Sequence, residues 1–203
     1  MKTVTIADFT FVVNTDITPA MDTTLSNSAN NITQAIIFIN QATAKTTYRV
    51  TVDGVTVSDN TDGNDPLSTT TVAADLQSGL NSVLTGFTTA VNGPVIHIKK
   101  NDGSDFSIDG NDTQGNTKMT IIKDSVQQFT DLPNVSPNGY VVEVQGDEDT
   151  NFDNYYVQFK TNNGGAFEEG RWEETVEAGI PFKFNYNTMP HVLIRQADGD
   201  FRF

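Results

Sequence analysis

Helical periodicity is confined to one segment of this chain, and this limits the fold more than any other feature. From residue 70 to residue 84, apolar residues recur at three- and four-residue steps, as they do on one face of a helix. Elsewhere apolar and polar residues alternate, as at Tyr48, Val50 and Val52, which is typical of half-buried strands. The sequence therefore predicts a mainly β fold with one helix at residues 70–84.

A change of pattern near residue 132 predicts two domains. Residues 1–132 combine strand patterns with the helix and predict a small α+β unit, in which the helix covers one face of an antiparallel sheet. Residues 134–138, with two prolines nearby, predict a linker. Residues 133–203 alternate throughout and predict an all-β domain that is sandwich-like or barrel-like.

Two short stretches make sharper structural predictions. The apolar run Ile36–Ile39 has no polar residue, so it predicts a strand buried on both faces. The pair Asp53-Gly54 lies between two alternating runs. Both residues tolerate a positive φ, so they predict a hairpin with a type I′ turn.

Charge and cysteine content exclude several kinds of protein. The net charge of the 203 residues is −14, which argues against ordinary nucleic-acid binding, because that needs clustered Lys and Arg. The same charge suits a surface past which DNA slides without sticking, although acidity that serves only solubility remains open. The absence of cysteine excludes disulfides and cysteine metal sites. No apolar run approaches the ~20 residues that span a bilayer, and the N-terminus lacks the layout of a signal peptide.

Four glutamates surround the single tryptophan, Trp172, and are the first candidates for chemistry: Glu168, Glu169, Glu173 and Glu174. Paired carboxylates beside an aromatic ring could indicate glycoside hydrolysis. In a strand, however, neighbouring residues point to opposite faces, so Glu173 and Glu174 cannot flank one bond. We therefore expect a solvated edge strand whose charges oppose aggregation.

The remaining candidates also favour structural roles. Neither His97 nor His191 has a second ligand at metal-binding spacing, so each is expected to be a hydrogen-bonded structural residue. The loop Asp59–Ser68 is rich in Asp and Asn but does not supply the Asp, Gly and Glu of a calcium loop in register. Lys99-Lys100 belongs to no phosphate-binding motif and is expected at a strand end. We predict no catalytic, cofactor-binding or metal-binding residues, and no enzyme.

Three segments together carry a family resemblance: Phe129–Asp147, Asn154–Val176 and Asn187–Phe201. They resemble the tail tubular protein B family, the tail nozzle proteins of short-tailed bacteriophages. The matching residues follow the family order and are Leu132-Pro133, Gly139-Tyr140, Tyr155-Tyr156-Val157, Trp172-Glu173 and Met189-Pro190-His191. The part before residue 129 is similar in outline only.

The resemblance implies a structural virion protein rather than an enzyme. It implies six copies in a ring below the portal and adaptor, around the channel through which DNA leaves, with tail fibres docked outside and DNA passing without specific binding. Synthesis would take place in the host cytoplasm. Family members are several times longer, so the resemblance also implies an excised region or a separated piece. It carries over no catalytic residues, and Met189-Pro190-His191 would form a rigid turn.

Two alternatives remain open at this point. Some tail proteins contact cell-surface sugars, so a carbohydrate-binding or polysaccharide-degrading phage tail protein is the second hypothesis. A β-rich adhesin from outside phages is the third, and the missing secretion signal argues against it.

Overall fold

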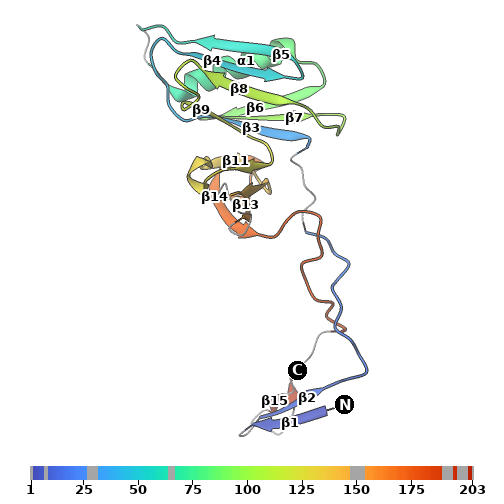
Figure 1. Ribbon diagram of the computed structural model, residues 1–203. Coiled ribbons are helices and arrows are strands. Elements are labelled where there is room, and N and C mark those ends of the chain that lie inside the picture. The colour runs from blue at the N-terminus through green and yellow to red at the C-terminus, as the bar shows by residue number, and fades with distance from the viewer. Residues whose placement is uncertain are drawn as a thin grey trace. The chain divides into compact units, whose positions relative to one another are not determined.

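The computed structural model divides into two units (Figure 1). The larger unit comprises residues 29–177, and the smaller one joins residues 1–28 to residues 178–203. The described residues are 2–6, 9–26, 32–63, 67–146, 154–188, 194–195 and 201–202. The expected boundary at residue 132 falls inside the larger unit, and separate folding of its two sides stays a prediction.

The larger unit begins with two antiparallel sheets and the helix α1 (Thr69–Val83). The four-stranded sheet has the order β6 (Phe87–Asn92), β7 (Val95–Lys100), β3 (Gln34–Ile39), β9 (Met119–Ile122). The three-stranded sheet has the order β5 (Val55–Asn60), β4 (Thr47–Val52), β8 (Ile108–Asp112). The predicted helix at residues 70–84 is confirmed to within one residue at each end.

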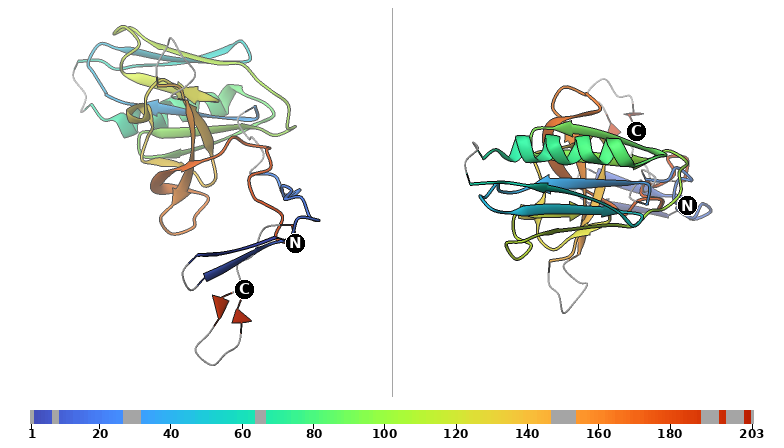
Figure 2. Two further views of the ribbon diagram at one scale, coloured as in Figure 1. Left: turned by 60° about the horizontal axis from the view of Figure 1, so that its bottom comes forward. Right: turned by 90° about the horizontal axis from the view of Figure 1, so that it is seen from above.

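Helix α1 packs across strands of both sheets, namely β3, β5, β6 and β7 (Figure 2). Its buried residues include Leu76 and Leu80, which join a cluster with Tyr48 and Val50 of β4. Gly79 allows this close approach, because a Cβ there would lie 2.5 Å from Cγ1 of Val57. Two sheets and one helix thus enclose the first hydrophobic core.

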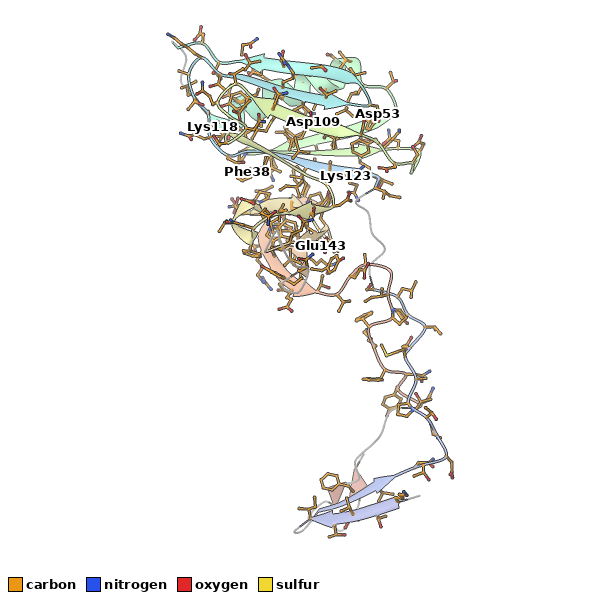
Figure 3. All side chains as sticks on the ribbon, viewed as in Figure 1. Phe38, Asp53, Asp109, Lys118, Lys123 and Glu143 are labelled. Atoms are coloured by element: carbon orange, nitrogen blue, oxygen red, sulfur yellow. The ribbon has the colours of Figure 1, made fainter. Side chains whose placement is uncertain are left out.

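Strand β3 is buried on both faces, as its apolar run predicted. Ala35 and Ile37 lie in the first core, whereas Ile36 lies in a second hydrophobic cluster. Phe38, labelled in Figure 3, packs against this second cluster. Because successive side chains of a strand point to opposite faces, the sheet that contains β3 is a central layer with a core on each side.

The second core is closed by a five-stranded sheet. Its order is β10 (Ser125–Val126), β12 (Val141–Val144), β13 (Tyr155–Thr161), β14 (Phe167–Thr175), β11 (Val135–Pro137). Strand β10 is parallel to β12 and the other pairs are antiparallel. Its buried side chains share one cluster with Ile36, Val95 and Ile122 of the central sheet. This sandwich-like packing confirms the predicted mainly β fold with one helix.

The expected linker at residues 134–138 is wrong, because this segment contains the strand β11. Val135, Ser136 and Pro137 are buried, and β11 pairs with β14. Proline has no N–H to donate, and it is tolerated here because β11 lies at the edge of its sheet. Prolines in this stretch therefore mark an edge strand that follows the short 3₁₀ turn Phe129–Asp131.

The predicted hairpin at Asp53-Gly54 is confirmed. Asp53 has a φ of 46° and Gly54 a φ of 81°, as a type I′ turn requires, and β4 pairs with β5 on either side. The Asp53 carboxylate also accepts a 2.9 Å hydrogen bond from the Lys100 ammonium group. This contact lowers the pKa of Asp53, mainly because the hydrogen bond favours the charged carboxylate.

The described residues of the smaller unit form two antiparallel strand pairs and a segment in which two stretches of chain lie side by side. Strand β1 (Lys2–Ile6) pairs with β2 (Phe9–Val13), and β15 (Ile194–Arg195) pairs with β16 (Phe201–Arg202). Residues 17–26 and 178–188 also lie side by side, through the isolated bridges Met21↔Phe184 and Leu25↔Pro181. Although residues 133–203 were expected to form strands throughout, the described residues 178–188 contain only these isolated bridges. We call residues 17–26 with 178–188 the ribbon.

Candidate functional site

Glu173 of the acidic cluster is held by two cations rather than aimed at a substrate. Its carboxylate accepts a 2.8 Å hydrogen bond from Nε of Arg171 and forms an ion pair with Lys160. These contacts, Lys160 first, lower the pKa of Glu173 and keep it ionised. Glu174 is exposed and next to it in β14, so the two carboxylates point to opposite faces of the strand, as predicted.

Glu168 stabilises the turn between β13 and β14. Its Oε1 accepts backbone hydrogen bonds of 2.9 Å from both Asn163 and Gly165. These bonds, Gly165 first, lower the pKa of Glu168. The backbone carbonyl of Glu169 accepts a hydrogen bond from Asn162 in the same turn. The glutamates before Trp172 therefore close a β-hairpin.

Trp172 joins strand β14 to the segment that leads into β11. Its indole Nε1 donates a 2.7 Å hydrogen bond to the carbonyl oxygen of Pro133. Its ring lies edge-on to Phe159, with the two ring centroids 5.0 Å apart. The indole is thus a half-buried structural anchor with its polar atom satisfied.

His97 of β7 lies between the central sheet and the five-stranded sheet. Its Nε2 is 2.8 Å from Oε1 of Gln34, and its ring contacts that of Phe167. Burial, with a smaller effect of the Lys99 charge, lowers the pKa of His97 to about 4. His97 is therefore neutral near pH 7 and hydrogen-bonded, as predicted. His191 and its neighbours Met189 and Pro190 lie outside the described residues.

The loop Asp59–Ser68 flanks a small cavity of about 80 Å³, although residues 64–66 lie outside the described part. Burial, and then the charge of Asp75, raises the pKa of Asp59. Within the described ranges, no three His, Asp or Glu residues are grouped as a metal site would need. The same ranges contain no helix long and apolar enough to cross a membrane.

Lys100, at the end of β7, has a carboxylate partner. Its ammonium group pairs with Asp53 and lies 5.6 Å from the centre of the Phe87 ring. Lys99 is exposed beside it. The basic pair thus occupies a strand end, as expected.

Tyr140 is the main structural residue whose role the sequence did not reveal. Its side chain is buried, and its hydroxyl lies 2.9 Å from the carbonyl oxygen of Lys123 and 3.3 Å from those of Gln34 and Ile122. Burial first, and the charge of Asp124 second, raises the pKa of this hydroxyl. Tyr140 therefore ties the residue before β12 to the central sheet. The Gly139-Tyr140 pair within the family resemblance was a signal for it in the sequence.

Comparison with known proteins assigns these features to a family. The bacteriophage nozzle protein family matches residues 1–203. The chain belongs to this family. It is also 28% identical, over 213 residues, to "Tail tubular protein gp12" of Escherichia phage T7. That alignment covers all of this chain and 26% of the relative, so the chain spans about a quarter of the relative's length. The predicted resemblance is confirmed.

Two of the three segments that carried the resemblance, Phe129–Asp147 and Asn154–Val176, meet in one core of this nozzle-family chain. Tyr140, Val157 and Phe159 are buried together, and Trp172 packs against them while it binds Pro133. The family pattern therefore describes how two sheets pack. Family membership indicates a structural protein of the phage tail.

Proposed function

We propose that this chain is part of a tail nozzle, in which identical copies form a ring, six in number on the family resemblance, around the channel through which DNA leaves the virion. In the whole protein, the same ring would dock the tail adaptor and the tail fibres. The family match over residues 1–203 is the observation that carries the proposal. The relative's name, a tail tubular protein, agrees with it.

The charge of the larger unit supports passage of DNA without binding. Residues 29–177 contain 21 acidic and 8 basic residues, a net charge of −13. At least four of the basic residues are held in ion pairs with carboxylates: Lys100, Lys123, Lys160 and Arg171. A channel wall of this kind repels phosphates and leaves few cations to retain them.

Image reconstruction of virions tests the position in the tail. We expect several copies of the larger unit around the tail axis, and their absence from particles grown without the protein. Location of this fold outside the tail, or a single copy per tail, would contradict the proposal.

A second measurement is fluorescence anisotropy with duplex DNA at low salt, where we expect no binding. Tight, salt-sensitive binding would contradict passage without contact.

The carbohydrate hypothesis predicts a different outcome. If the chain cleaves polysaccharide, incubation with bacterial capsule would release new reducing ends, and Glu173→Gln would abolish this release. We expect no release from either protein, because Glu173 is engaged by Lys160 and Arg171. Release by the unaltered chain alone would favour an enzyme over a structural role.

A further inference from the structure

We infer that the ribbon of the smaller unit is a docking surface for a second copy of this chain. The inference rests on the proposed function, since a ring of identical copies requires contacts between them. It adds the identity of the surface through which neighbouring copies make contact. Three properties of the ribbon support its assignment as this surface: its exposed apolar side chains, its charge and its lack of a core.

Exposed apolar side chains are concentrated in the smaller unit. Among the described residues, ten of the eighteen large exposed apolar side chains belong to it, although it has 54 of the 203 residues. The ribbon alone carries seven of them, from 37% to 65% exposed: Ile17, Met21, Leu25, Ile180, Phe182, Phe184 and Tyr186. Single exposed apolar residues are ordinary, whereas a set this dense marks an interaction surface.

Among the residues that the structure describes, the smaller unit shows no core to account for these side chains. Every described side chain in either hydrophobic cluster belongs to the larger unit. None of the described side chains of the smaller unit is buried. The ribbon is held by a few backbone hydrogen bonds, such as those from Asp22 to Lys183 and from Ser26 to Ile180. Two-stranded structures of this kind are marginal in water without a packing partner.

Charge favours a second copy as that partner. The ribbon contains two charged residues, Asp22 and Lys183, which are opposite in sign. The smaller unit as a whole has five acidic and four basic residues, a net charge of −1, against −13 for the larger unit. Two copies that met through their larger units would bring like charges together, whereas contact through a neutral ribbon avoids that cost.

Prolines in the ribbon indicate how the contact forms. Pro19 and Pro181 lack an N–H, and proline at an edge blocks the addition of another strand. We therefore assign the contact to apolar side chains packed against the neighbour, with Phe184 and Leu25 as central residues. They lie on the two opposite segments of the ribbon, and each takes part in one of its two isolated bridges.

Sedimentation velocity of the 203-residue chain, over a concentration series up to millimolar, tests the inference. We expect the mean mass to rise with concentration. Phe184→Asp and Leu25→Asp should each weaken self-association by roughly tenfold or more, because each replaces an apolar contact by a charge. Phe129→Asp is the matched control, since Phe129 is an exposed phenylalanine of the larger unit. It should leave self-association unchanged.

The near-ultraviolet spectrum of Trp172, which lies in the larger unit, shows whether the larger unit of each variant remains folded. A monomer at every concentration would overturn the inference, as would self-association that Phe184→Asp leaves intact or that Phe129→Asp weakens equally. The inference would also be overturned if Phe184→Asp weakened self-association of the 203-residue chain but left self-association of a longer polypeptide that contains this chain unchanged. In each of these cases, the position in the tail would still be decided separately by the virion reconstruction.

Discussion

The indole Nε1 of Trp172 donates a 2.7 Å hydrogen bond to the carbonyl oxygen of Pro133, 39 residues earlier in the chain. This bond connects two of the segments that identify the family. Strand β14 is thereby held against the segment that enters β11, on the side opposite its partner β13.

Trp172→Phe should destabilise the larger unit by about 1–2 kcal/mol, since it retains a ring against Phe159 but leaves the Pro133 carbonyl without its donor. Urea unfolding followed by circular dichroism measures this. Tyr155→Phe is the control, because Tyr155 is exposed and its change should stay within about 0.5 kcal/mol. Equal stability of Trp172→Phe and the unaltered chain would show that the hydrogen bond contributes nothing net.

Gly79→Ala should destabilise the fold, although Ala favours a helix over Gly by ~1 kcal/mol. The new Cβ would meet Val57 at 2.5 Å, and overpacking of this kind costs about 1–3 kcal/mol. In a Val57→Ala background, the same Gly79→Ala change should become stabilising, because the space is then free. Thermal unfolding of the four proteins gives both values, and an unchanged sign would disprove the contact.

Gly170→Ala should destabilise the β13–β14 pair. A Cβ at residue 170 would overlap the carbonyl oxygen of Lys160 and lie 2.8 Å from Cε1 of Phe159. Since the obstacle is backbone, we expect a loss of about 1–3 kcal/mol or more. Gly63→Ala is the comparison, because its Cβ would make only an ordinary 3.6 Å contact with Lys45. Similar stabilities for the two variants would count against this packing.

His97 should make the larger unit less stable as the pH falls from about 6.5 to about 4. Its pKa in the fold is about 4, against 6.5 for an unburied histidine, so only the unfolded chain takes up the proton in this window. The full difference corresponds to about 3 kcal/mol. His97→Gln should remove this part of the pH dependence in urea unfolding, while His191 acts equally in both proteins. A pH profile that His97→Gln leaves unaltered would contradict the buried neutral state.

The amino-acid pattern determined the elements whose signals are local. The helical spacing at residues 70–84 predicted α1, and the apolar run Ile36–Ile39 predicted a strand with two buried faces. Asp53-Gly54 predicted a turn, because few residues tolerate positive φ. The order of the family residues indicated a tail nozzle protein, and the adjacency of Glu173 and Glu174 separated their side chains without any tertiary information.

Tertiary structure alone decided what depends on residues far apart in the chain. Pro133 and Pro137 suggested a linker by composition, yet pairing with β14 turns residues 135–137 into a buried edge strand. The alternation at Phe182 and Phe184 suggested a sheet strand, but the bridges in this stretch are two isolated ones, from Phe184 to Met21 and from Pro181 to Leu25. Periodicity records which side chains share a face and cannot say which distant segment will cover them, so the exposed apolar ribbon became visible only in the fold.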